Sequence, residues 1–203
     1  MSIDMLVLRR VEQGVPWAFT LWEPTSVMVV MGRGGDLQKE VRLDVCHGDR
    51  VPVFRRRTGG GTVVLGPGMV VFSLGRIVEK PLIIKEYQIA INSMLVDFLD
   101  ELGISPVAVR GISDLCIGDK KILGSGMFRR QKLLFFQGSL LVSPDLTLMD
   151  RYLKHPPREP GYRRGRPHDS FVTTLLREGW TLSPKEILLS LRRHLEKHLP
   201  GIQ

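Results

Sequence analysis

The chain has 203 residues, enough for one domain with one sizeable core. Because 43% of its residues are hydrophobic and 25% are charged, its composition is that of a globular protein and excludes a disordered or fibrous chain. The formal net charge of +8 calls for an anionic partner, such as a nucleic acid, a phosphate-bearing ligand, an acidic protein or a membrane surface.

Short helices and strands alternate in the N-terminal half. The apolar pattern predicts, in chain order, a helix over residues 2–13, strands over 17–22 and 26–31, a helix over 36–45, and strands over 51–56, 62–65 and 69–74. Ser2 and Asp36 have side chains that cap helix N-termini, and Gly48 would close the second helix.

Longer elements follow in the C-terminal half. The sequence predicts, in chain order, a helix over residues 84–102, strands over 114–117, 121–128 and 133–142, a helix over 144–153, a loop over 155–170 and a C-terminal helix over 183–199. Ser183 and Glu186 have the spacing of a capping box at the start of that last helix. Strands grouped between helices, with hairpins, indicate a single α+β domain over residues 1–203 rather than a regular βαβ array.

Several absences narrow the class of protein. Cys46 and Cys116 are the only cysteines and form no CxxC pair, so we expect a reducing, cytoplasmic compartment. No apolar run reaches the about 18 residues of a membrane-spanning helix, and we expect no signal peptide. His194 and His198 have helical spacing, but without a third ligand we expect them to face solvent and predict no metal site.

The first segment with candidate chemistry reads RRRTGGGT. Consecutive glycines allow the backbone to approach a ligand, and the arginines and threonines add donors suited to a phosphate or carboxylate. A lone triple glycine is more often a flexible turn beside a solvated strand, and the pattern is not that of a P-loop. The candidate ligand-binding residues are Arg55, Arg56, Thr58, Gly59, Gly60, Gly61 and Thr62.

Two later segments combine glycines with reactive side chains. Lys121 precedes Gly124-Ser125-Gly126 on a predicted hairpin, where it would reach over a ligand or simply keep the hairpin soluble. Asp114, on the neighbouring strand, would pair with this lysine or with a metal. Gly138, followed by Ser139, interrupts an apolar strand, which marks either a close backbone–ligand approach or a bulge.

In this order, the segments resemble the lipoate–protein ligase family, within the superfamily of biotinyl/lipoyl ligases and octanoyltransferases. The matching motifs are RRxTGGGTV at 55–63, DxxxGxKKIxGSG at 114–126, QGSLLVSPDL at 137–146 and RGRPHDSFVTTL at 165–176. The resemblance implies an α+β fold with a mixed, largely antiparallel sheet flanked by helices, like the catalytic domain of class II synthetases and biotin ligases. It also implies that family members often continue into an accessory domain. We therefore expect either a separate accessory subunit or transferase chemistry that needs no adenylation.

The resemblance further implies an activity. Lipoate or octanoate would be activated with ATP and Mg²⁺ to an acyl-adenylate (lipoyl-AMP for lipoate). The acyl group would then pass to a lysine of a carrier domain of the 2-oxoacid dehydrogenase E2 or glycine-cleavage H protein type. By motif position, Lys121 would be the catalytic residue that holds the carboxylate and phosphate oxygens. The residues that would bind cofactor or substrate are Arg55, Arg56, Thr58, Gly59, Gly60, Gly61, Thr62, Asp114, Gly124, Ser125, Gly138 and Ser139.

Other readings stay open. Val63, Val64, Met69 and Val71 would line an acyl slot or belong to plain sheet core. Leu65 and Gln137 stand where family members carry histidine, which would suit a non-catalytic subunit that binds lipoate or a carrier. Cys116, five residues before Lys121, is expected to belong to the core of an apolar strand. The alternative is a thiolate of lowered pKa, which an ATP-independent octanoyl or lipoyl transferase would need.

The positive charges favour a small anionic ligand. They fall within the ligase motifs, and there is no RNP-type aromatic motif, so we expect no nucleic-acid partner and no membrane partner. The basic loop over residues 155–170 would either bind an acidic carrier domain or fold over the adenylate.

Overall fold

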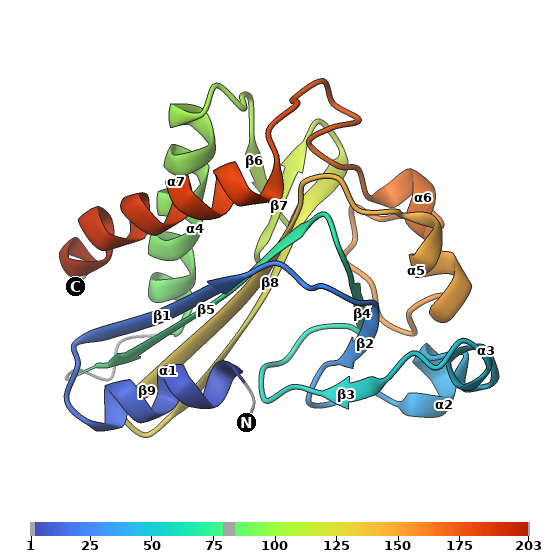
Figure 1. Cartoon of the computed structure of the whole chain (residues 1–203), viewed down its shortest axis with the longest axis horizontal. Helices are drawn as coiled ribbons and strands as arrows, with labels where there is room; N and C mark the ends of the chain where they lie inside the picture. Colours follow the sequence, from blue (N-terminus) through green and yellow to red (C-terminus); the bar gives the residue numbers. More distant parts are fainter. Residues whose placement is uncertain (1–2, 79–83, 203) are drawn as a thin grey trace.

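A computed structural model describes residues 3–78 and 84–202. Its centre is a sheet of six strands in the order β1-β5-β9-β8-β7-β6, in which every neighbouring pair is antiparallel (Figure 1). The strands are β1 (Trp17–Trp22), β5 (Met69–Ile77), β6 (Ala108–Arg110), β7 (Asp114–Ile117), β8 (Lys120–Arg130) and β9 (Leu133–Leu141).

A second sheet of three strands lies beside the first, in the order β3-β2-β4. Its strands are β2 (Met28–Met31), β3 (Val53–Arg55) and β4 (Val63–Leu65), and β2 is parallel to β3 but antiparallel to β4. The short helices α2 (Leu37–Glu40) and α3 (Leu43–Gly48) connect β2 to β3. The predicted single helix over 36–45 is therefore wrong. Val41 is extended and forms a bridge with Leu153, which interrupts the helix.

Successive side chains of β5 point to opposite faces of the large sheet, so they belong to two separate parts of the core. Val70, Phe72 and Leu74 pack against the helices α4 (Ile84–Glu101) and α7 (Pro184–His198), which lie on one face of the large sheet (Figure 1). Met69 and Val71 point to the other face, where they pack with Leu65 of the small sheet. The two sheets therefore enclose apolar side chains between them, and this is where the cavity described below lies.

The remaining helices close the edges of this arrangement. α1 (Ile3–Glu12) packs on the large sheet, where a Cβ at Gly75 would lie 2.7 Å from Val7 Cγ1, so glycine is needed for the close packing. α5 (Thr147–Tyr152) contacts β4 of the small sheet, α6 (His168–Phe171) contacts α5 and β8, and the 3-10 helix η1 (Leu199–Gly201) follows α7.

Most predicted elements, and the α+β class with a largely antiparallel sheet, are confirmed. The capping box of Ser183 and Glu186 is present at the start of α7. Asp36 caps α2, whereas Ser2 lies outside the described residues. The sequence missed β6, and it missed α6 at the end of the predicted loop. In the described part of the chain, none of the helices combines the length and apolar character needed to cross a bilayer.

Candidate active site

A cavity of about 230 Å³ lies between the two sheets and the loop over residues 155–170. Of the predicted site residues, those that line it are Arg56, Gly60, Gly61, Thr62, Lys121, Gly124, Ser125, Gly138 and Ser139. Arg55, Thr58, Gly59 and Asp114 lie outside the lining. The structure thus brings three motifs that are far apart in the sequence to one cavity.

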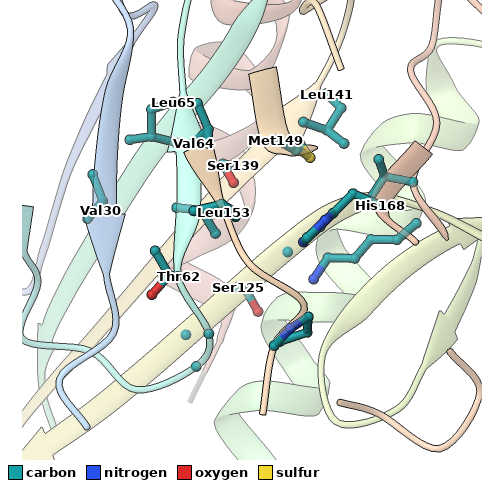
Figure 2. Close-up of a pocket in the computed structure, with 18 of the residues that line it drawn as sticks. Val30, Thr62, Val64, Leu65, Ser125, Ser139, Leu141, Met149, Leu153 and His168 are labelled. Atoms are coloured by element: carbon teal, nitrogen blue, oxygen red, sulfur yellow. The ribbon is translucent and has the colours of Figure 1, made fainter. Parts of the chain in front are cut away.

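One end of the cavity is apolar. Leu65, Leu141 and Met149 gather there, whereas Thr62 and Ser125 lie toward the other end (Figure 2). The four residues that would form either an acyl slot or plain sheet core, Val63, Val64, Met69 and Val71, all line the cavity. Leu65 and Gln137, which replace the histidines of the family pattern, line it too.

Arg56 organises the glycine loop. Its Nη2 donates to the carbonyls of Gly59 and Gly61, both at 2.8 Å. Its Nη1 donates to the Val30 carbonyl at 3.1 Å, and its Nε donates to Thr58 Oγ1 at 2.9 Å. Because the guanidinium holds two carbonyls of the loop, it fixes the orientation of the peptide groups that border the cavity.

Arg55 does not reach the cavity, so its predicted contact with a ligand is not supported by its position. Its Nη1 instead donates to the carbonyls of Gly32, Arg33 and Gly35, at 3.2, 3.2 and 2.8 Å. The side chain therefore braces the turn that follows β2. Thr58 is also structural, because its buried hydroxyl donates to Gln137 Oε1 at 2.8 Å.

Glycines along β8 and β9 are required by close packing. A Cβ at Gly124 would lie 2.7 Å from Lys121 Nζ, and a Cβ at Gly126 would lie 2.7 Å from the Gly59 carbonyl oxygen. Gly138 pairs in register with Phe72, without a bulge, and a Cβ there would collide with the Phe72 ring. The physical reason for glycine at this position is therefore the core on the far face of the sheet.

Lys121 is held at the cavity by a chain of polar contacts. Its Nζ lies 2.7 Å from Asp114 Oδ1, which confirms the predicted pairing of these two residues. Tyr162 donates its hydroxyl to Asp114 Oδ2 at 2.8 Å. Burial, with Cys116 and Asp114 nearby, raises the pKa of Tyr162 far above its usual value, so this hydroxyl stays protonated and remains a donor.

Removing the Tyr162 hydroxyl is expected to loosen Lys121. In Tyr162→Phe, Asp114 loses one hydrogen bond, and we expect the free energy of unfolding to fall by about 1 kcal/mol and the affinity of the cavity for an anionic ligand to fall about tenfold. Chemical denaturation and calorimetric titration with inorganic pyrophosphate measure the two effects. Tyr152→Phe is the matched control, because Tyr152 donates to Asp49 at 2.9 Å and does not line the cavity. An equal loss of affinity in both variants would contradict a positioning role for Tyr162.

Cys116 faces Lys121 across β7 and β8, and the expectation that it belongs to the core is confirmed, whereas the alternative of a thiolate is not supported. The side chain is fully buried and does not line the cavity. Burial raises the pKa of the Cys116 thiol, and this outweighs both the hydrogen bond to Tyr162 and the charge of Lys121. The thiol donates to the Tyr162 oxygen at 3.5 Å, so it packs behind the lysine.

Arg163 is a candidate ligand-binding residue that the sequence placed only on a basic loop, with no role of its own in the cavity. It lines the cavity, is only 4% exposed, and stacks over the Phe171 ring at 4.8 Å. Its Nε donates to the Arg166 carbonyl and lies 3.4 Å from Glu159, but no described residue accepts from its buried Nη2. A buried guanidinium N–H without an acceptor is costly, so this group is suited to an anionic ligand. The RGRPHDSF motif lies only two residues downstream, but its spacing gave no signal for Arg163.

His168 was also missed, although it lies within that motif. It lines the cavity, and its Nδ1 donates to Asp150 Oδ1 at 2.8 Å, because a carboxylate can only accept. Burial lowers the pKa of His168, and this outweighs the opposing effect of Asp150. The ring is therefore neutral at neutral pH and presents Nε2 as an acceptor.

The basic loop forms one wall of the cavity. Pro156, Arg158 and Pro160 line it together with Arg163, and Arg166 anchors the loop to Asp119 with a 2.6 Å contact. This position favours the expectation that the loop folds over a ligand. Among the described lining residues there is no Asp or Glu, so the protein offers no carboxylate ligands for Mg²⁺ in the cavity.

The chain is similar to proteins of one family. The family model described as the lipoyl protein ligase A/B catalytic domain matches residues 1–196. A probable lipoate-protein ligase A from Mycoplasma genitalium is 31% identical over 137 residues, which are 65% of this chain and 38% of that protein. The lipoate-protein ligase A of Psychrobacter cryohalolentis is 33% identical over 138 residues, which are 67% of this chain and 38% of that protein. The chain thus spans about two fifths of the length of these curated relatives.

Solved structures share the fold. A chain from a study of a bi-partite lipoate protein ligase and its E2 lipoyl domain from Thermoplasma acidophilum superposes with a TM-score of 0.82 at 24% identity, covering 97% of this chain and 76% of that one. A lipoate-protein ligase A bound with ATP gives a TM-score of 0.79 at 24% identity, covering 97% and 78%. At such identities the likeness concerns the fold alone.

Proposed function

Because the chain belongs to the lipoyl protein ligase A/B catalytic-domain family, we propose that it activates lipoate or octanoate with ATP and transfers the acyl group to a lysine of a carrier domain. The observation that carries this proposal is the cavity itself. Its lining combines apolar residues that suit an acyl chain, among them Val64, Met69 and Val71, with the cationic side chains of Lys121 and Arg163. An acyl-adenylate has the same division, with an apolar tail joined to a charged phosphate.

The proposed reaction has two steps. The carboxylate oxygen of the acid attacks the α-phosphorus of ATP, the bond to the β-phosphate oxygen breaks, and pyrophosphate leaves. The amine of the carrier lysine then attacks the acyl carbonyl, AMP leaves with the electron pair of the broken C–O bond, and a proton passes to solvent. Both steps place negative charge on oxygens that fixed N–H donors stabilise.

Each donor has a proposed role. Lys121 would hold the acid's carboxylate against the α-phosphate, and the Gly60 and Gly61 backbone, oriented by Arg56, would border the nucleotide. Thr62, Gly124, Ser125, Gly138 and Ser139 would shape the rest of the cavity, and Asp114 would act by holding Lys121. Mg²⁺ would enter bound to the phosphates of ATP, since the described lining offers it no carboxylate.

Arg163 would bind the anionic part of the ligand through its free Nη2. We expect Arg163→Met to weaken binding of ATP or of an acyl-adenylate analogue about tenfold to a hundredfold, because a charge-assisted hydrogen bond is lost. The methionine would still cover the Phe171 ring, so the free energy of unfolding should be unchanged or higher. Calorimetric titration and denaturation measure these quantities. Arg164→Met, at an exposed neighbour, is the control, and unaltered affinity in Arg163→Met would contradict the assignment.

The activity is tested with the purified chain, ATP, Mg²⁺, lipoate or octanoate, and an apo lipoyl domain. Mass spectrometry of the carrier should show the mass of one acyl group on its target lysine. Since the relatives are longer than this chain, the assay is repeated with a supplied accessory domain of such a relative. Absence of both acyl-adenylate and modified carrier in every arm would refute the proposal.

A carrier domain of the 2-oxoacid dehydrogenase E2 or glycine-cleavage H protein type is the proposed acceptor. The exposed side chains of Arg158 and Arg164 lie on the loop beside the cavity, where they would attract an acidic carrier surface. We also propose that residues 1–203 form one catalytic domain and that this domain works together with a separate accessory subunit.

The alternative is an ATP-independent transferase with Cys116 as its nucleophile. The Cys116 thiol is buried and its pKa is raised, which argues against this alternative. We expect Cys116→Ser to retain acyl transfer within about twofold per folded molecule, because the side chain lies behind Lys121 and outside the cavity. Cys46→Ser, at another buried cysteine, is the control for folding. Loss of transfer in the Cys116 variant alone, without loss of folding, would favour the transferase.

A further inference from the structure

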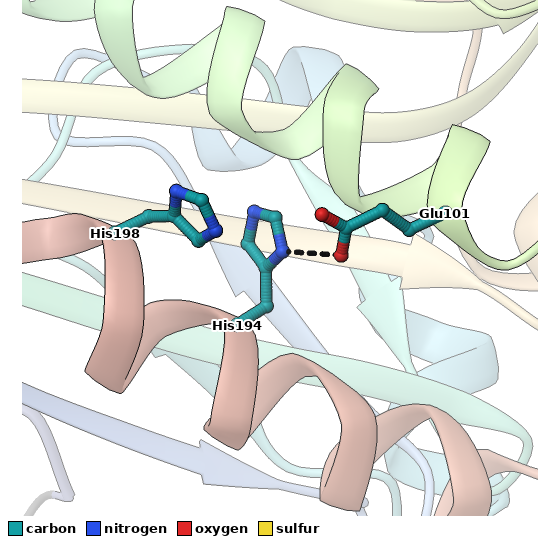
Figure 3. A group of neighbouring side chains, drawn as sticks. All are labelled: Glu101, His194 and His198. Carbon is teal, nitrogen blue, oxygen red and sulfur yellow. Dashed lines mark hydrogen bonds and ion pairs between the residues drawn. The ribbon is translucent and has the colours of Figure 1, made fainter.

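A second cluster of polar side chains lies far from the cavity, between α4 and α7. Glu101 ends α4, while His194 and His198 lie one turn apart on α7 (Figure 3). The expectation that the two histidines face solvent is wrong for His194, which is only 5% exposed. Glu101 places a carboxylate beside them. One ligand atom from each residue lies within 4.8 Å of the others.

The hydrogen bonds of His194 place the lone pair of its Nδ1 opposite the Glu101 carboxylate. Its Nε2 lies 3.1 Å from the Met94 carbonyl oxygen, which can only accept, so Nε2 carries a hydrogen. In the neutral ring, Nδ1 then presents a lone pair, yet it lies 2.9 Å from Glu101 Oε2. Two lone pairs at this distance repel each other, unless a proton or a metal ion lies between them.

His198 favours the metal ion. Its ring stacks on His194, with the centroids 4.3 Å apart, and its buried Nε2 has no partner among the described residues. A proton between His194 and Glu101 leaves this nitrogen unpaired, whereas a metal ion gives it a partner. The Met94 carbonyl also fits, because histidines that bind metals usually donate their other N–H to a backbone carbonyl or carboxylate.

We propose that Glu101, His194 and His198 form a binding site for a first-row divalent metal ion of the Zn²⁺ class. Two imidazoles and one carboxylate are the ligands such ions take, with water in the fourth position. A cavity of about 320 Å³ lined by Glu101 and His194 gives water access to this position. Ligands of a tetrahedral zinc ion lie about 3.4 Å apart, so the half-buried His198, in the last turn of α7, must turn toward Glu101.

The ion would fasten α7 to α4 and thereby to the large sheet that both helices cover. Lys197 and Arg193 also border this cavity, and their charges lower the affinity for a cation without removing the ligands. The site is separate from the proposed active site, since none of its ligands lines that cavity. Its existence therefore does not depend on the proposed function.

Titration of the metal-free protein with Co²⁺ tests the site, because Co²⁺ bound by nitrogen and oxygen ligands absorbs visible light. We expect one equivalent to bind, to be displaced by Zn²⁺, and Zn²⁺ to raise the melting temperature. Glu101→Gln and His198→Ala should each weaken binding at least about tenfold. These variants are chosen because His194 is buried and its replacement can prevent folding.

His47→Ala is the matched control, since it removes an exposed histidine elsewhere. It should leave Co²⁺ affinity and the thermal shift unchanged. The proposal is overturned if the wild-type chain binds no Co²⁺, or if His198→Ala and Glu101→Gln bind as tightly as His47→Ala. In that case His194 and Glu101 form an ion pair held by a proton.

Discussion

Replacement of Lys121 by alanine is expected to slow acyl-adenylate formation about 10²- to 10³-fold, which is the cost of removing one fixed donor from a developing oxyanion. Lys121 lines the cavity and forms an ion pair with Asp114. Its side chain also lies so close to Gly124 that a Cβ there would collide with it. Its Nζ lies 2.7 Å from Asp114, so the ammonium is already oriented before a ligand enters. The rate of pyrophosphate release with lipoate and ATP measures the effect.

Two variants separate this loss from general damage. Lys120→Ala removes the neighbouring exposed lysine and should keep the wild-type rate. Asp114→Asn in the Lys121→Ala background removes the charge that Lys121→Ala leaves unpaired, so it should restore stability but not the rate. Adenylate formation by Lys121→Ala at the rate of Lys120→Ala would rule out the role assigned to this lysine.

Arg56→Lys is the second variant with a large expected effect, although it keeps the charge. A lysine cannot reproduce the bonds that the guanidinium makes to Thr58, Val30, Gly59 and Gly61. We expect the free energy of unfolding to fall by about 3 kcal/mol. Since the loss frees the glycine loop, adenylate formation should slow about 10²-fold.

Denaturant unfolding and the same pyrophosphate assay measure both consequences. Arg57→Lys is the control, because this neighbouring arginine is exposed and does not line the cavity. If Arg56→Lys and Arg57→Lys behaved alike, the bonds of Arg56 to the loop would not hold the site together.

The sequence motifs correctly predicted which segments meet at the cavity, but they did not predict the role of every residue within them. Gly60, Lys121 and Gly138 were expected near one another because of their motif order, and one cavity contains all three. The resemblance to the lipoate–protein ligase family is confirmed by the family match over residues 1–196. Arg55 could not be placed from sequence, because it ends β3 and bonds to the turn after β2, whereas Arg56, the next residue, reaches the cavity.

Features that depend on long-range contacts escaped the sequence. The break between α2 and α3 arises from the bridge of Val41 to Leu153, which no local propensity reveals. Cys116 lies beside Lys121, as its spacing suggested, but burial decides its pKa and follows from the fold. The pairing of His194 with Glu101 likewise joins residues from two helices.

The cavity would hold an acyl-adenylate, with the acyl chain among its apolar residues and the phosphate at Lys121 and Arg163. A calorimetric titration with a non-hydrolysable lipoyl-AMP analogue tests it most directly, because binding needs neither a carrier nor turnover. We predict one analogue bound per chain, with affinity strongly reduced in Lys121→Ala and in Val71→Trp, whose side chain would fill the apolar end. Absence of binding to the wild-type chain, or equal affinity in all three proteins, would contradict the account.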